Sequence, residues 1–429
     1  MYRMILEKLK EWKESEERKP LIIMGARQVG KTWIMKEFGE KNYSKVAYIS
    51  FYNNARMTSV FENDFDISRI IMSLNIETGV TITPRDTLII FDEIQDAPKV
   101  LESLKYFCEE ANEYHVIAAG SLLGVSIHNG ISYPVGKVNV LDLYPLNYRE
   151  FLYAMGEEQM ADALSTKDYQ LIDSFSDKYL FWLKNYYFVG GMPAVVESFR
   201  LKKDYEHVRV LQNDILRQYE GDFGKHIESR QLPRIKMVWD SIPIQLAKEN
   251  KKFFFGQIKK GGRSSEFELA IQWLNDCGLV NKVYRVNEPH IPLKAYKNMN
   301  VFKLFLIDVG LLGAMSDVPA KSILEGNEIF VEFKGAMTEQ YVLQQIISDT
   351  KYKPYYFGTD KSTFEQDFMI QKDTEIIPIE VKAETNVHSK SLKMYCDKYK
   401  PNQAIRLSAL KYINQGWMEN LPLYAICNL

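Results

Sequence analysis

The first residues able to do chemistry form a glycine-rich run near the start of the chain. Gly25-Ala26-Arg27-Gln28-Val29-Gly30-Lys31-Thr32 fits the pattern G-x-x-x-x-G-K-[ST]. The glycines let backbone N–H groups wrap a polyanion, and a helix beginning at Lys31 points the positive end of its dipole to the same place. Lys31 can reach the β- and γ-phosphates of ATP, and the Thr32 hydroxyl can ligate Mg²⁺. An apolar strand before the run and a helix after it favour this interpretation over an ordinary surface loop.

Two carboxylates follow an apolar strand about 60 residues further on. The segment Thr87-Leu-Ile-Ile-Phe91 is followed by Asp92 and Glu93. Asp92 is expected to hold Mg²⁺ through water, and Glu93 to polarise the attacking water, which makes both residues candidates for ATP hydrolysis. A strand that ends in acidic residues at the surface is common by itself, and the phosphate-binding run favours the catalytic interpretation.

A small hydroxyl follows another apolar strand. Val116-Ile-Ala-Ala119 is succeeded by Gly120 and Ser121. Ser121 is predicted to contact the γ-phosphate or the attacking water, although an ordinary strand-to-loop turn has the same composition.

A second set of charged residues lies near the end of the chain. The period of a strand over residues 376–382 puts Glu380 and Lys382 on one face, Asp367 lies on a neighbouring strand, and Glu339 lies on a helix. Two carboxylates can hold a divalent metal, and Lys382 can orient or activate water at a phosphodiester. Because alternating acid and base is also ordinary cross-strand pairing, the pattern leaves cleavage and a structural role open.

Alternating strands and helices must position the first set of residues. Apolar runs predict strands at 20–24, 46–51, 87–91 and 116–119, and an amphipathic stripe predicts a helix over 100–108. This alternation is typical of a parallel α/β sheet, and the chain then turns helical from about residue 150 to 225.

The middle of the chain looks like a winged helix over residues 236–290. Phe267, Ile271 and Leu274 share one helical face, and Gly278 lies where a recognition helix would pass into a wing. The preceding stretch is basic: it carries Lys248, Lys251, Lys252, Lys259, Lys260 and Arg263. Such a patch binds DNA phosphates or forms a solvated basic loop, and the sequence leaves both open.

Composition places further bounds on the chain. Its 429 residues predict roughly two to four domains, and 46% hydrophobic with 26% charged residues are ordinary values for a globular protein. A net charge of −2 excludes a globally basic nucleic-acid coat. The four cysteines lack metal-ligand spacing, and no run approaches the roughly 18–20 apolar residues that span a bilayer, so we expect a cytoplasmic protein without a membrane partner.

The motifs in order resemble the AAA-type P-loop ATPases. More narrowly, the chain is similar to a bacterial and archaeal family of AAA ATPases with a C-terminal domain of uncharacterised function. The residues that carry this resemblance are Gly25–Thr32, Phe91–Gln95, Gly120-Ser121, Leu143–Phe151, Gly190–Pro193 and Asn213–Ile215.

The resemblance implies an α/β fold with a P-loop ATPase core and a parallel sheet at 1–160. It also implies a helical lid at 161–225 and a winged-helix segment at 226–325. For 326–429 it implies an α/β restriction-endonuclease-like domain. There Asp367 and Glu380-x-Lys382 resemble the PD-(D/E)xK nuclease signature, and Glu339 matches the helix glutamate often found before it.

One departure concerns the arginine that senses nucleotide. Relatives usually carry Gly-Arg where this chain has Gly136-Lys137, and lysine supplies charge without a bidentate fork. Arg149 and Arg217 are candidates for an arginine finger, with an ordinary surface arginine as the alternative for each. Because AAA-type modules often form rings with trans-acting arginines, a homo-oligomer and a monomer both stay open.

Three functional hypotheses follow. The first is an ATP-hydrolysing switch that couples Mg-ATP turnover to DNA, RNA or a protein partner. The second is an ATP-gated, metal-dependent nuclease that uses the C-terminal residues. The third is a nucleotide-binding interaction scaffold with slow turnover.

Overall fold

The computed structural model describes residues 1–429 except for 121–132, 225–229, 249–250, 326–330, 360–363 and 384–387. The chain forms two compact units. The N-terminal unit consists chiefly of residues 2–144, and residues 276–278 group with it. The C-terminal unit consists of residues 145–275 and 279–429. In the described part of the chain, no helix is long and apolar enough to cross a membrane.

A five-stranded parallel sheet forms the centre of the N-terminal unit, with strand order β2-β3-β4-β1-β5. Its strands are β1 (Leu21–Met24), β2 (Lys45–Ser50), β3 (Thr87–Asp92), β4 (His115–Ala119) and β5 (Asn139–Asp142). The first four confirm the strands predicted from apolar runs. The fifth was not predicted, because β5 alternates between partly buried and exposed residues and carries only two apolar side chains, Val140 and Leu141. Since all five strands are parallel, the loops after β1 and β3 leave the same edge of the sheet.

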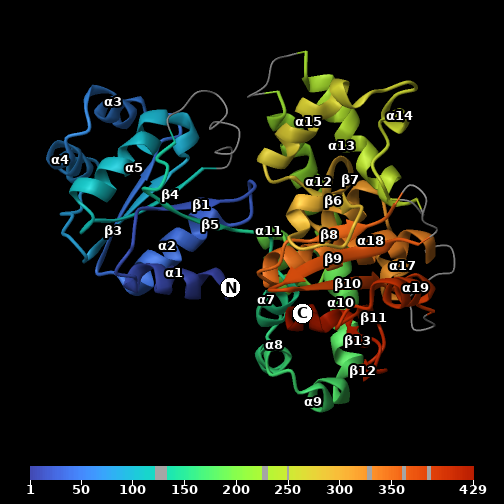
Figure 1. Cartoon of the computed structure of the whole chain (residues 1–429). Helices are drawn as coiled ribbons and strands as arrows, with labels where there is room; N and C mark the ends of the chain where they lie inside the picture. Colours follow the sequence, from blue (N-terminus) through green and yellow to red (C-terminus); the bar gives the residue numbers. More distant parts are fainter. Residues whose placement is uncertain (121–132, 225–229, 249–250, 326–330, 360–363, 384–387) are drawn as a thin grey trace. The chain divides into compact units, whose positions relative to one another are not determined.

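Helices cover both faces of this sheet (Figure 1). On one side lie α1 (Ile5–Glu14) and α2 (Lys31–Asn42), and on the other lie α3 (Ala55–Asn63), α4 (Ile67–Thr78) and α5 (Pro98–Glu110). Residues 88–91 of β3 are fully buried, as expected for a strand with both faces covered. One of the two cores contains an edge-to-face cluster of Phe51, Phe61, Phe91 and Phe107.

The C-terminal unit begins with helices, as the sequence predicted. These are α7 (Tyr148–Ala154), α8 (Glu158–Ser165), α9 (Tyr169–Ser174), α10 (Ser176–Val189), α11 (Pro193–Lys202) and α12 (Tyr205–Asp222). Further helices are α13 (Leu232–Leu246), α14 (Phe255–Ile258), α15 (Ser264–Asp276), α16 (Val309–Met315), α17 (Ala320–Leu324), α18 (Val331–Asp349) and α19 (Lys390–Tyr399).

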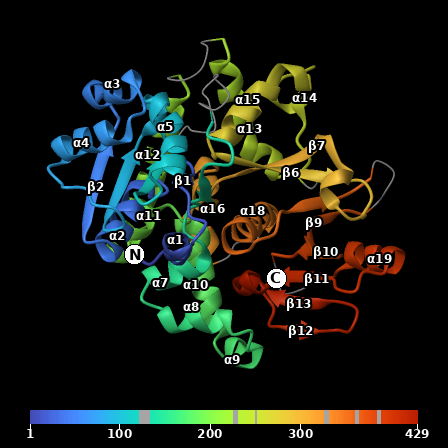
Figure 2. The same ribbon diagram turned by 60° about the vertical axis from the view of Figure 1, so that its left-hand side comes forward.

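An eight-stranded sheet runs through the rest of this unit in the order β12-β13-β11-β10-β9-β8-β6-β7. Its strands are β6 (Val280–Val286), β7 (Lys297–Leu306), β8 (Tyr355–Phe357), β9 (Gln366–Lys372), β10 (Glu375–Val381), β11 (Ile405–Ser408), β12 (Ile413–Asn414) and β13 (Glu419–Pro422). Helix α18 packs against β7 and β10, and α19 lies against β10 (Figure 2). The hairpin of β6 and β7 joins the later strands by parallel pairing of β6 with β8. The sheet therefore spans the limit proposed near residue 325, and the predicted domain limits stay predictions.

Three glutamines of α18 connect this helix to its neighbours. Gln340 brackets the end of β7: its side chain accepts from the Leu306 amide at 2.9 Å and donates to the Leu306 carbonyl at 2.7 Å. Gln344 accepts from the Val309 amide at 2.9 Å, and Gln345 accepts from the Tyr148 amide at 2.7 Å. Buried backbone groups that lack a secondary-structure partner need such bonds, so α18 completes the ends of β7, α16 and α7.

Two glycines allow α10 to meet its neighbours closely. A Cβ on Gly191 would lie 2.1 Å from the Leu146 carbonyl oxygen, and one on Gly190 would lie 2.1 Å from Asp308 Oδ1. The Gly191 amide also donates to Asp308 Oδ2 at 2.6 Å. The glycine pair thus marks a point of close packing at the end of α10, and Pro193 then begins α11.

Candidate nucleotide site and the predicted charged sites

The loop between β1 and α2 has the shape that the glycine-rich run predicts. Gly25 has φ +147°, and a Cβ there would lie 2.3 Å from the Leu143 carbonyl oxygen. Gly30 has φ +97° at the N-cap of α2, which begins at Lys31. Only glycine adopts both conformations without strain, so the two glycines set the path of the loop and aim the helix N-terminus into it.

An arginine that the sequence did not indicate supports this loop. Arg3 is 4% exposed and donates to the Val29 carbonyl at 3.1 Å and to the Tyr144 carbonyl at 2.6 Å. It ties the loop to the chain that leaves β5. No motif predicts this contact, because it joins residues far apart in the sequence.

Lys31 lies inside the loop rather than in solvent. It is 8% exposed, and its ammonium donates to the carbonyls of Gly25 at 2.8 Å and Ala26 at 2.7 Å. Burial lowers the pKa of Lys31 to about 8, against the opposing effect of the Glu93 and Asp92 carboxylates. Phosphate oxygens accept charge-assisted hydrogen bonds, which are stronger than those to neutral carbonyls, so a polyphosphate competes well for this ammonium.

Thr32 and Asp92 lie next to each other at the carboxyl ends of the parallel strands. The Thr32 hydroxyl donates to Asp92 Oδ2 at 2.6 Å, and Asp92 is 3% exposed at the end of β3. A hydroxyl and a carboxylate are the oxygen donors that Mg²⁺ prefers, and Mg²⁺ keeps several waters and takes ligands from substrate phosphates. The pair therefore fits Mg²⁺ bound together with a nucleotide. Within the ranges described, no three acidic, histidine or cysteine side chains form a metal site of their own.

Tyr48 on β2 also contacts Asp92, and the sequence did not predict this contact. Its hydroxyl donates to Asp92 Oδ2 at 3.0 Å, and burial together with the Asp92 charge raises the pKa of Tyr48 to about 12. The Lys36 ammonium lies 3.7 Å from the centre of the same ring. The contact follows from the parallel register that pairs Ser50 with Asp92, which an isolated sequence does not give.

Glu93 adopts a conformation that few residues tolerate. Its φ is +54°, in the left-handed region, and Gln95 Nε2 donates to Glu93 Oε2 at 2.6 Å. Residues held in this region are enriched at functional sites, and the amide fixes one carboxylate oxygen. The third predicted catalytic residue, Ser121, lies outside the described residues.

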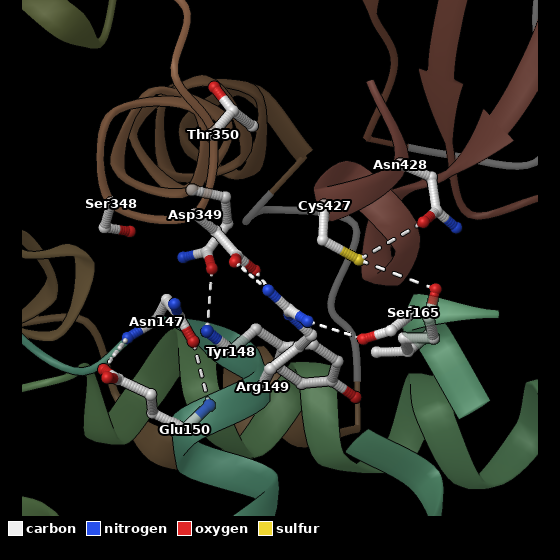
Figure 3. A network of polar contacts seen from close by, with 12 residues as sticks. Asn147, Tyr148, Arg149, Glu150, Ser165, Ser348, Asp349, Thr350, Cys427 and Asn428 are labelled. Carbon is white, nitrogen blue, oxygen red and sulfur yellow. Dashed lines mark hydrogen bonds and ion pairs between the residues drawn. The ribbon is translucent and has the colours of Figure 1, made fainter. Parts of the chain in front are cut away.

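The cations considered for an arginine finger have different surroundings. Figure 3 shows Arg149 directed at Asp349 of α18: Nε donates to Asp349 Oδ2 at 2.9 Å, and Nη1 donates to Ser165 at 2.6 Å. The Arg149 side chain is only 16% exposed, so it is not the surface arginine that was the alternative for it. Arg217 is 79% exposed and pairs with Asp214 one turn away at 3.5 Å. In the N-terminal unit, Lys137 pairs with Glu109 at 2.8 Å.

The winged-helix segment has the expected order of elements, with α13, α14 and α15 followed by the hairpin β6–β7. Its basic stretch is less free than the sequence suggested. Lys251 forms a close ion pair with Glu339, and Lys259 pairs with Glu266 at 3.1 Å. The exposed side of α15 carries Glu268, Leu269 and Gln272 rather than cations. A winged helix that binds nucleic acid stays a prediction.

The four residues of the nuclease-like signature fall into two groups. Glu339 and Asp367 interact electrostatically with each other and with the same lysines, Lys251 and Lys303. Glu380 pairs instead with Lys382 at 2.9 Å on the same strand. Asp367 lies beside that strand, since its Oδ2 accepts from the Val381 amide at 2.8 Å. Burial and the Glu339 charge raise the pKa of Asp367 to about 7. Cleavage by these residues stays a prediction. In the part of the unit that the structure describes, no three acidic, histidine or cysteine side chains are grouped so that they could hold a metal.

Family comparisons assign the segments of the chain. Residues 17–152 match an AAA domain, residues 180–322 match a domain of unknown function (DUF8612), and residues 334–426 match another (DUF4143). As predicted, the chain thus contains a segment that matches an AAA domain, followed by an α/β region, while the likeness of that region to restriction endonucleases stays a prediction. No curated protein matches the chain.

Among solved structures, similar chains include a Walker-type ATPase of Pyrococcus abyssi, with 13% identity and a TM-score of 0.43 over 72% of this chain and 94% of that one. The ORC1 protein of Aeropyrum pernix in complex with DNA gives 15% identity and a TM-score of 0.29 over 76% and 95%. AMPPCP-bound DnaA of Aquifex aeolicus gives 13% identity and a TM-score of 0.27 over 64% of this chain and 88% of that one.

Proposed function

We propose that this chain binds and hydrolyses Mg-ATP, and that its nucleotide state controls the binding of a nucleic acid or a protein partner. One observation carries the proposal. The hydroxyl of Thr32, at the end of the phosphate loop, lies 2.6 Å from Asp92, a carboxylate 60 residues later. A phosphate loop and an acidic strand end that meet in this way form the two halves of a Mg-nucleotide site.

The proposed roles follow from the contacts. The backbone amides of Gly25–Gly30 bind phosphate oxygens, and Lys31 exchanges the Gly25 and Ala26 carbonyls for the β- and γ-phosphates. Thr32 and Asp92 hold Mg²⁺, which when bound neutralises charge on the transferred phosphoryl group. Glu93, with one oxygen fixed by Gln95, orients the attacking water and accepts its proton. Ser121, which lies outside the described residues, stays our candidate for a contact with the γ-phosphate or the attacking water.

The first experiment separates binding from turnover in the intact chain. Calorimetry measures ATP binding with Mg²⁺, and phosphate release measures hydrolysis. Lys31→Ala should lose binding. Glu93→Gln should bind ATP normally and lose turnover by roughly 10²–10⁴-fold, the usual contribution of a general base. Glu110→Gln, an exposed glutamate of α5, is the matched control. Full hydrolysis by Glu93→Gln would contradict the proposed role.

The second experiment tests the proposed output. Hydrolysis is measured with and without single-stranded DNA, double-stranded DNA and RNA. Exposed Lys260 and Arg263, next to α15, support nucleic acid as a ligand, so we expect one of the three to raise turnover. Equal rates in all mixtures would favour a protein partner. Tight ATP binding with negligible hydrolysis in every oligomeric state would replace the switch by a nucleotide-binding scaffold.

A further inference from the structure

The C-terminal unit buries two lysines against the carboxylates of its nuclease-like signature. Lys303, in the middle of β7, is 1% exposed, and the side chain of Lys251 is 12% exposed. Both approach Glu339 of α18, which is 6% exposed. A lysine is rarely buried to this extent unless it is paired, so these contacts determine whether the site can fold.

The contacts converge on one position between β7, β9 and α18. Lys303 Nζ lies 2.7 Å from Glu365 Oε1 and 3.6 Å from Glu339 Oε2. Lys251 Nζ contacts the other oxygen of the same carboxylate, Glu339 Oε1. Within the described part of the unit, Glu339 Oε2 accepts no hydrogen bond, so the charge of Lys303, 3.6 Å away, is what compensates it.

Electrostatics agrees with this geometry. Burial alone lowers the pKa of Lys303, but Glu339, Glu365 and Asp367 raise it well above the usual value. Burial likewise raises the pKa of Glu339, and Lys251 with Lys303 lowers it below the usual value. Both groups are therefore ionised in the folded unit. Two ammonium groups carry the charge of one divalent cation, and they form ion pairs with two carboxylates, Glu339 and Glu365.

We propose that Lys251 and Lys303 occupy the position and supply the charge of a divalent cation between these carboxylates, which, as arranged around the two lysines in the described structure, form no group able to hold a metal. Their two positive charges offset the two carboxylates that they contact, Glu339 and Glu365, and these contacts hold β7 and the residues before α14 to α18 and to the residue before β9. The C-terminal unit consequently folds without metal. Its nuclease-like residues do not cleave phosphodiesters, because the carboxylates that would bind a metal are already compensated and Glu380 is engaged with Lys382.

The first test compares the intact, nucleotide-free chain in EDTA, Mg²⁺ and Mn²⁺. The unfolding temperature of the C-terminal unit should be the same in all three, and no cleavage of DNA or RNA should appear with either metal. A rise with Mn²⁺ that Glu339→Gln abolishes would overturn the proposal, and so would cleavage that Lys382→Ala abolishes.

The second test removes the internal cation. Lys303→Met leaves the carboxylates buried with one ammonium, so its unfolding temperature should fall by roughly 5–10 °C, whereas exposed Lys294→Met should change little. Mn²⁺ should then restore part of the loss in Lys303→Met and nothing in the parent. A variant as stable as the parent, or one that is destabilised and gains nothing from Mn²⁺, would overturn the stand-in role. If Lys303→Met does not fold, Lys251→Met gives the same readout at a more exposed position.

Discussion

Replacing Tyr48 by phenylalanine removes one hydroxyl from Asp92 and leaves the ring in place. In the structure, Asp92 Oδ2 accepts two hydrogen bonds, from Thr32 at 2.6 Å and from Tyr48 at 3.0 Å. If Thr32 turns to Mg²⁺ during nucleotide binding, Tyr48 becomes the side chain that still holds Asp92. The loss of the Tyr48 hydroxyl should therefore cost more with Mg²⁺ bound than without it.

The size of the effect follows from the type of bond. Hydrogen bonds to charged groups contribute about 1.5–3 kcal/mol, and Tyr48 is only partly buried, so we take the lower end. About 1.4 kcal/mol corresponds to a tenfold change in an equilibrium constant. The Mg²⁺ concentration that gives half-maximal ATP hydrolysis should rise about tenfold in Tyr48→Phe. Nucleotide binding in EDTA should stay unchanged, because the phosphate loop is intact.

The assay is a titration of Mg²⁺ at saturating ATP with phosphate release as the readout, paired with nucleotide binding in EDTA. Tyr52→Phe is the matched control, since Tyr52 follows the same strand and is 65% exposed. An unchanged Mg²⁺ dependence in Tyr48→Phe would refute the argument that this hydroxyl positions Asp92. Equal losses with and without Mg²⁺ would show instead that the hydroxyl only stabilises the fold.

Three further predictions concern charge and packing. Burial holds the pKa of Lys31 near 8 and bound phosphates favour its charged form, so above that pH ATP binding must take up a proton. Affinity measured by calorimetry should fall up to about tenfold between pH 8 and 9, and should not fall in Lys31→Arg, which does not titrate there. Arg149→Met removes the guanidinium that pairs with the Asp349 carboxylate, whose side chain is 3% exposed, and urea denaturation should show a loss of about 3 kcal/mol in the free energy of unfolding. Gly191→Ala places a Cβ 2.1 Å from a carbonyl oxygen and should lower the free energy of unfolding by about 3 kcal/mol or more. Gly221→Ala, whose Cβ would meet no described atom within 4 Å, should instead stabilise α12 by about 0.5–1 kcal/mol.

Local patterns were enough to predict the fold class. Apolar runs located four of the five strands of the parallel sheet, because a strand covered on both faces is apolar throughout. The order of those strands could not be predicted from periodicity. Strand β5 was not predicted because its residues alternate between partly buried and exposed positions and only two of them are apolar. The strands predicted around Asp367 and Glu380 were also found: they are β9 (366–372) and β10 (375–381), and they are joined by a turn at Asp373.

The candidate nucleotide site was predictable where its residues are adjacent in the sequence. Lys31 and Thr32 belong to one motif. Asp92 ends an apolar strand, and the presence of that motif earlier in the chain is what made it a candidate for Mg²⁺ binding. Arg3 and Tyr48 form hydrogen bonds with residues that are far away in the sequence. The residues next to them in the sequence form no motif that would predict these contacts. Knowledge of strand register would have indicated Tyr48, since β2 pairs with β3 along its whole length.

The buried position of Lys303 could have been predicted from the sequence around it, although no motif includes this lysine. Val301-Phe-Lys-Leu-Phe-Leu306 is an apolar strand with a single lysine at 303. A cation in such a run must be paired, because an ammonium without a partner cannot be buried at an acceptable cost. The structure brings two downstream carboxylates to this lysine: Glu339 of the nuclease-like signature, and Glu365, which is not part of it. Acidic residues that match a metal-dependent signature should therefore be read together with the buried cations of the preceding segment, since an internal ammonium and a metal compete for the same oxygens.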